Sequence, residues 1–212
     1  MKRWLRFTAA VLAAAFLFAL TGCGSSTNSA SFTWFVDSIP ANLDPQVASG
    51  ASDVIACENL YGTLVRKDPD GELVPGLCEK WTVSPDGLTY TFTLKDGLTY
   101  AAAKGAATEY DITAEDFVFA FRRIFHAETA SPYAVEFSAI QNSAAVLAGL
   151  ADESSLGVSA NGALTLVFRL SERDDNFLAK LAMPGAAPCD EAFFESTRGT
   201  YGLTAKTTLA SG

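Results

Sequence analysis

Cysteine and histidine, whose side chains often serve as nucleophiles, as bases near neutral pH or as metal ligands, are few in this chain. The 212 residues contain four cysteines, Cys23, Cys57, Cys78 and Cys189, and one histidine, His126. A lone histidine near the end of a predicted helix is more often a surface residue stabilised by the helix dipole than a general base. The last three cysteines are irregularly spaced and do not describe a disulfide framework, although a Cys57–Cys78 bridge remains open outside the cytoplasm.

Known catalytic patterns are missing from the sequence. Residues 126–128 (His-Ala-Glu) and the later Pro188-Cys189 share part of the zinc-deaminase pattern, but Ala192 stands where the second cysteine is needed. The chain has no G-x-S-x-G, phosphate-binding loop or dinucleotide fingerprint. Adjacent carboxylates such as those at 174–175 are typical of solvated surfaces. We therefore expect no enzyme, no cofactor and no metal site.

Cys23 stands between the most apolar and the most polar stretch of the chain. Three basic residues within the first six precede an almost wholly apolar run at 9–20. This pattern is typical of a secretory signal peptide, and the run is shorter than the ~20 residues of a membrane span. Leu20-Thr21-Gly22-Cys23 resembles the lipobox of bacterial lipoproteins, which implies cleavage before Cys23 and lipid on that residue. A plain signal peptide with a chance cysteine, or an uncleaved anchor, is the alternative.

Charge and composition limit the class of partner. The whole chain has 15 basic and 24 acidic residues and a net charge of −9. Without residues 1–22, which hold three basic and no acidic residues, 12 basic residues remain and the net charge is −12. An acidic surface argues against nucleic acid as a partner. Hydrophobic residues make up 49% of the chain, so a packed core is expected.

The hydrophobic pattern predicts alternating strands and helices. We expect strands at 31–37 and in hairpins formed by 81–84 with 88–94 and by the two halves of 156–170. We expect helices at 52–65, 112–126, 133–150, 176–182 and at the end of 183–197, and a single helical turn at 74–81. Phe117, Phe121 and Phe125 form one apolar stripe of the 112–126 helix, which predicts packing against the apolar face of the two hairpins.

Six segments, in order, resemble one known family. They are "LDP" (43–45), "NLYGTLV" (59–65), "VPGLCEKW" (74–81), "SPDGLTYTFTLKDG" (84–97), "TAEDFVFAFRR" (113–123) and "LSERDDNFLAKLAMPGAAP" (170–188). Their order is similar to that in the bacterial extracellular solute-binding proteins of family 5, the peptide- and nickel-binding receptors of ABC importers. The loop at 99–111 departs from the family's pattern.

The resemblance implies an α/β fold of the periplasmic-binding-protein-like type II class. It implies a signal peptide at 1–22, a polar tether at 23–30, a first part of lobe one at 31–62, a small inserted α+β domain at 63–182 and a return to lobe one at 183–212. The family continues into a second lobe that these residues do not include. The chain is thus expected to be an N-terminal fragment carrying one wall of a ligand cleft.

The resemblance also implies ligand-binding residues. The segment "TASPYA" (129–134) is similar to that of oligopeptide-binding members, in which its tyrosine lies near the bound peptide; here it is Tyr133. The stretch after "LDP", Ser49, Gly50 and Ala51, approaches the ligand in such members. Ser49 stands at a position that is acidic in some peptide receptors.

The function implied by the resemblance is capture of oligopeptides outside the membrane. The expected partners are an oligopeptide, the permease subunits of an ABC transporter, and the membrane through lipid on Cys23; the expected location is the extracytoplasmic face of a bacterial membrane. A peptide-pheromone receptor, a receptor for nickel chelates or other solutes, and a surface lipoprotein hydrolase remain alternatives. A single histidine makes direct nickel coordination the weaker of these.

Overall fold

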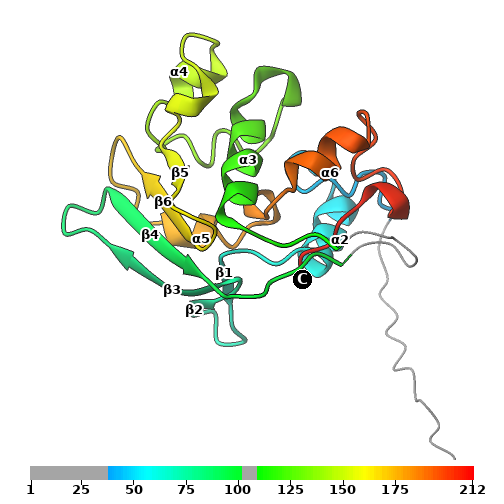
Figure 1. Cartoon of the computed structure of the whole chain (residues 1–212), viewed down its shortest axis with the longest axis horizontal. Coiled ribbons are helices and arrows are strands. Elements are labelled where there is room, and N and C mark those ends of the chain that lie inside the picture. Colours follow the sequence, from blue (N-terminus) through cyan, green and yellow to red (C-terminus); the bar gives the residue numbers. More distant parts are fainter. Residues whose placement is uncertain (1–37, 102–108) are drawn as a thin grey trace, which may run out of the picture. The chain divides into compact units, whose positions relative to one another are not determined.

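The computed structural model describes residues 38–101 and 109–212 (Figure 1). The predicted strand at 31–37 and the lipobox lie outside the described residues. The longer helices are α2 (Ala51–Leu60) and α3 (Ala114–Phe125); shorter helices are α4 (Ser143–Leu147), α5 (Phe177–Lys180) and α6 (Glu191–Ser196). The strands are β1 (Val65–Lys67), β2 (Leu73–Pro75), β3 (Cys78–Val83), β4 (Thr89–Leu94), β5 (Val158–Ala160) and β6 (Thr165–Arg169). Single 3-10 turns lie at Ala127–Thr129, Glu153–Ser155, Pro184–Ala186 and Ala205–Thr207.

A four-stranded antiparallel sheet in the order β3-β4-β6-β5 carries α3 on one face (Figure 1). Its two outer pairs are the predicted hairpins, and β4 joins them because Tyr90 pairs with Phe168 and Phe92 with Leu166. Alternate residues of β4 and β6 are buried, as period-two patterning requires. The turn between β3 and β4 uses Gly87 at φ +72°, a conformation that glycine adopts without a steric penalty.

The aromatic stripe of α3 packs on this sheet as predicted. Phe117 and Phe121 are fully buried, and Phe125 is 1% exposed. The Phe121 ring centroid lies 4.9 Å from that of Phe168 on β6 and 4.9 Å from that of Phe137, both edge to face. At the start of the helix, an Asp116 carboxylate oxygen accepts hydrogen bonds from the Thr113 backbone N–H at 2.7 Å and the Thr113 hydroxyl at 3.2 Å. The first turn of the helix is therefore capped.

The predicted helix at 52–65 ends five residues earlier than expected. α2 stops at Leu60, and Tyr61 is extended at φ −119° and ψ 128°. The chain cannot continue as a helix here because residues 63–64 pair with the next hairpin: Leu77 N–H bonds to Thr63 O at 2.8 Å and Gly76 N–H to Leu64 O at 2.9 Å. The apolar residues at the end of this segment belong to buried extended chain, which periodicity did not separate from a helix.

The predicted helical turn at 74–81 was also wrong. Its residues form parts of β2 and β3, and β2 pairs antiparallel with β1. Of the helix predicted at 133–150, only α4 is helical in the structure. Before α4 the chain makes overlapping turns, and its backbone bonds to the sheet, with Gln141 N–H donating to Arg169 O at 2.9 Å. Asn142 then takes φ +63°, which interrupts any helix.

The three described cysteines, Cys57, Cys78 and Cys189, are free and fully buried. The Cys57–Cys78 bridge left open above is not formed. Cys57 and Cys78 act as small apolar side chains of the core, whereas the Cys189 sulfur accepts a hydrogen bond from Arg123 Nη1 at 3.5 Å. Among the described residues, no helix is long and apolar enough to cross a membrane.

Candidate functional site

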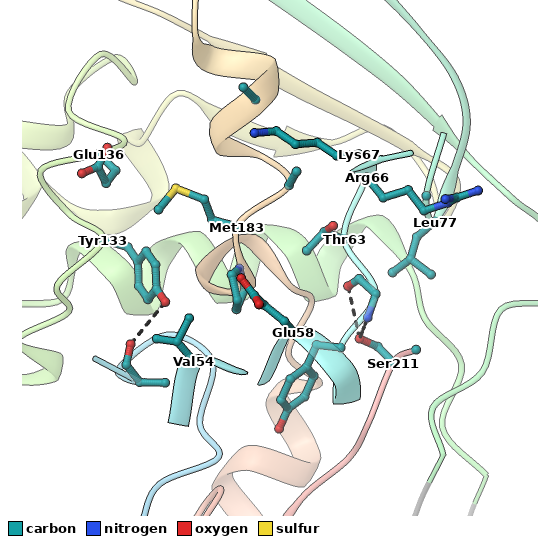
Figure 2. Close-up of a pocket in the computed structure, with 18 of the residues that line it drawn as sticks. Val54, Glu58, Thr63, Arg66, Lys67, Leu77, Tyr133, Glu136, Met183 and Ser211 are labelled. Atoms are coloured by element: carbon teal, nitrogen blue, oxygen red, sulfur yellow. Dashed lines mark hydrogen bonds between the residues drawn. The ribbon is translucent and has the colours of Figure 1, made fainter. Parts of the chain in front are cut away.

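A cavity of about 920 Å³ opens beside α2, and residues far apart in the sequence line it (Figure 2). Its wall combines the loop at 48–49, α2, residues 61–63, β1, the turn that contains Tyr133, and residues 179–184. A volume of this size lies within the ~300–1,000 Å³ typical of ligand pockets. It is the larger of the two most prominent pockets in the described parts of the chain, and two of the residues implied by the family resemblance, Tyr133 and Ser49, line it.

Tyr133 is held in this wall by contacts on three sides. Its hydroxyl donates a hydrogen bond to the Ala48 carbonyl oxygen at 3.2 Å, and its backbone N–H bonds to the Ser131 hydroxyl oxygen at 3.2 Å. Its ring lies flat against Gly185, where an added Cβ would come within 2.4 Å of the ring. Only 6% of the residue is exposed, and burial raises the pKa of its hydroxyl to about 12. The side chain is thus a neutral, rigidly placed part of the cavity wall.

The stretch after "LDP" is divided between the cavity and its rim. Ser49 is exposed and lines the cavity. Gly50 caps the start of α2 and Ala51 is its first residue; both are exposed, and the lining includes neither. The structure therefore brings Tyr133 and Ser49 to one cavity and places Gly50 and Ala51 just outside it. Tyr133 lies in a run of turns at 132–139 rather than in the helix that was expected after Pro132.

A buried polar network behind the cavity fixes the loop at 44–48. Arg123 of α3 donates to Asp44 at 2.5 Å and to the Gln46 side-chain oxygen at 2.6 Å. The Gln46 side-chain amide donates to the carbonyl oxygens of Gly185 at 3.3 Å and Ala187 at 3.0 Å. These bonds tie α3, the loop and the 184–187 segment together, so the position of the Ala48 carbonyl that receives the Tyr133 hydroxyl depends on Arg123.

Several lining residues were not singled out by the sequence. They are Glu58 on α2, Arg66 and Lys67 on β1, Glu136 and Met183. Nothing in their spacing marks them, because they meet only through tertiary packing. Asp44 and Arg123 had a weaker signal, because both lie within segments quoted for the family resemblance, 43–45 and 113–123.

His126 lies away from this cavity. It is exposed, and its ring Nδ1 is 3.3 Å from a Glu153 carboxylate oxygen beside a second, smaller surface pocket. Within residues 38–101 and 109–212, no group of three or more His, Cys, Asp or Glu side chains is arranged to hold a metal ion.

Comparison with known proteins defines the family. Residues 72–212 match the model of bacterial extracellular solute-binding proteins, family 5. The chain is 33% identical over 159 residues to the periplasmic murein peptide-binding protein MppA of Escherichia coli, which covers 74% of this chain and 28% of that protein. It is 30% identical over 188 residues to the oligopeptide-binding protein AliA of Streptococcus pneumoniae, covering 88% of this chain and 28% of that protein.

A solved structure agrees. The substrate-binding domain of an oligopeptide ABC transporter from Bacillus anthracis superposes with a TM-score of 0.76 at 31% identity, covering 82% of this chain and 32% of that one. The chain therefore belongs to family 5 of the bacterial extracellular solute-binding proteins and has their periplasmic-binding-protein-like α/β fold. It spans about a third or less of the length of these relatives.

Proposed function

We propose that the protein to which these residues belong binds oligopeptides outside the cytoplasm and delivers them to an ABC transporter permease. The observation that carries the proposal is the cavity itself: in a family 5 fold, Tyr133 and Ser49 meet in a concave wall large enough for a peptide segment. The relatives named above are peptide-binding proteins, which supports a peptide as the ligand.

The proposed binding mode uses the wall as one half of a cleft. An extended peptide has main-chain groups that need hydrogen-bond partners and side chains that need room. Ser49 supplies an exposed hydroxyl, and the ring of Tyr133 supplies a flat surface. A second lobe closing over the peptide by a hinge motion would complete the site.

Replacing Tyr133 with phenylalanine tests the site. The ring stays, but the hydrogen bond to the Ala48 carbonyl is lost, so the wall loosens at the position next to Ser49. A loss of ~0.5–1.5 kcal/mol in the free energy of unfolding is expected, and the affinity for peptides should fall because the wall is less well fixed. The measurement is calorimetric titration of a defined oligopeptide mixture into the full-length protein and its Tyr133→Phe variant.

The matched control is Tyr90→Phe. Tyr90 is equally buried, but it lies in the sheet and does not line the cavity. Its variant should bind like the unaltered protein. A Tyr133→Ala variant that keeps its circular dichroism spectrum and binds every peptide as tightly as the unaltered protein would place Tyr133 outside the site.

Lipid anchoring is the second part of the proposal, and it rests on the sequence around Cys23. A lipid on this residue would hold the receptor at the membrane surface through the polar tether at 23–30. In the Cys23→Ala variant the lipid cannot attach, so the expressed protein should leave the membrane fraction and lack the mass of the modification. Mass spectrometry and fractionation measure both. Ser25→Ala, two residues further along the tether, is the control that should stay anchored. Unchanged membrane retention of the Cys23 variant together with an unchanged mature mass would disprove lipid attachment.

A further inference from the structure

Four charged side chains surround the cavity: Glu58, Glu136, Arg66 and Lys67. None of the ion pairs within residues 38–101 and 109–212 includes any of these four side chains. Within those residues, the four charges therefore have no ion-pair partner. Charges that line a concave surface act more strongly on a ligand than charges on a flat surface, because the low-dielectric walls focus their field. Their arrangement therefore decides which ligand charges the cavity favours.

The two carboxylates lie in the Tyr133 half of the cavity. Glu136 follows Tyr133 by three residues and lies beyond it in Figure 2. Glu58 points from α2 toward the middle of the cavity (Figure 2). After burial and Cys57, the charge of Glu58 also contributes to the raised pKa of Tyr133. A cation in this half would meet negative charge from both glutamates.

The basic residues lie in the opposite half, on β1. Arg66 and Lys67 are neighbours in a strand, so their side chains leave on opposite faces. Figure 2 shows the Lys67 amine directed toward the centre of the cavity and the Arg66 guanidinium directed away from it. Lys67 is thus the basic group available to a bound molecule. Val54 and Met183, which lie beside Tyr133 in Figure 2, provide uncharged surface.

We propose that this cavity selects ligands by charge polarity, with a cationic group seated beside Tyr133 near Glu58 and Glu136 and an anionic group toward Lys67. The inference rests on the proposed peptide binding and narrows it to a class of peptide: one with a positive charge in the segment that lies over Tyr133. Two parts of a peptide could supply that charge, a lysine or arginine side chain or the free α-amino group.

A panel of pentapeptides separates the two sources. Its members are alanine peptides with lysine, glutamate or alanine at the centre, each with a free and with an acetylated amino terminus. The full-length protein should bind the lysine peptides roughly fivefold to tenfold more tightly than the glutamate peptides, the size expected of one charge-assisted hydrogen bond in a partly wet site. If acetylation weakens the lysine, glutamate and alanine peptides alike, the α-amino group is the bound cation; if lysine peptides stay tighter than glutamate peptides after acetylation, the side chain is.

Charge-neutral variants test the assignment to residues. Glu58→Gln should reduce the preference for lysine to about twofold or less while leaving the affinity for the acetylated alanine peptide unchanged. Lys67→Gln should weaken binding of every peptide with a free carboxylate and spare amidated ones. The matched control is Glu172→Gln, an exposed glutamate that does not line the cavity.

The outcomes separate this inference from the proposed function. If all the peptides bind equally well and Glu58→Gln changes nothing, charge selection is disproved while peptide binding stands. If no peptide binds to the full-length protein, both the charge selection and the proposed peptide binding are disproved. The difference between lysine and glutamate peptides should also shrink as salt is raised from 0.05 to 0.5 M, because added ions shorten the range of these interactions to a few ångströms (about 4 Å at the upper value); a salt-independent preference would contradict an electrostatic origin.

Discussion

Replacing Phe121 with alanine is expected to lower the free energy of unfolding by about 3–5 kcal/mol. Phe121 is fully buried, and its ring meets Phe137 and Phe168 edge to face, each with centroids 4.9 Å apart. Removing the ring leaves a cavity between α3 and β6 that close-packed neighbours cannot fill without moving. Both the lost apolar burial and the aromatic pairs contribute to the effect. Chemical denaturation followed by tryptophan fluorescence or circular dichroism measures it.

Two further variants make the measurement specific. Phe121→Leu keeps most of the buried volume and should cost clearly less than alanine. Val135→Ala removes apolar atoms from a side chain that is 72% exposed, and its effect should stay within ~0.5 kcal/mol. A Phe121→Ala effect below about 1 kcal/mol would mean that the stripe of α3 does not hold the sheet.

This part of the fold could be predicted because local patterns determine it. The hairpin of β3 and β4 has alternating apolar residues and a Pro-Asp-Gly turn, and α3 has an apolar stripe with a polar cap. Each of these features can be recognised in a short stretch of sequence without knowledge of the rest of the chain. The elements at 61–64 and 133–142 were misjudged because their conformation is set by backbone hydrogen bonds to distant segments, such as Gln141 to Arg169. Apolar spacing over so few residues does not separate a helix from buried extended chain.

The candidate site divides in the same way. Tyr133 and Ser49 were reached through the family resemblance, since the segments around them keep a recognisable order. Glu58 and Lys67 were not reached, because α2 and β1 meet across the cavity only after folding. Arg123 belongs to the segment at 113–123 that carries the family resemblance. Its pairing with Asp44 was not predicted, because the two residues are 79 positions apart in the sequence. Pairing of that kind is visible only in three dimensions.

Arg123 and Asp44 form the buried ion pair of the network behind the cavity. Their side chains are each only 8% exposed, and their closest nitrogen and oxygen atoms are 2.5 Å apart. The Arg123 guanidinium carbon also lies 4.0 Å from the centroid of the Phe194 ring, a cation–π contact that fills the space behind the pair. Removing the cation would leave the Asp44 carboxylate without its charged partner inside the protein.

The second large effect is therefore expected for Arg123→Met, a loss of about 3–5 kcal/mol in the free energy of unfolding. The neighbouring Arg122 is the matched control: it is only half-buried and makes no ion pair among the residues the structure describes. Arg122→Met should change stability by no more than ~0.5 kcal/mol. Similar losses for the two variants would show that the helix tolerates neither methionine and that the ion pair is not the cause.

A double-mutant cycle separates the ion pair from packing. Asp44→Leu combined with Arg123→Met replaces both charges with apolar groups, so no buried charge remains unpaired. The double variant should be more stable than the sum of the two single losses predicts, by at least ~1 kcal/mol. Arg123→Met removes the hydrogen-bond partner of the Gln46 side-chain oxygen, so the loop at 44–48 should loosen in this single variant and in the double variant. Peptide affinity should therefore stay low in the double variant although its stability partly recovers. Additive single effects, measured by denaturation of all four proteins under one set of conditions, would show that Asp44 and Arg123 do not stabilise each other.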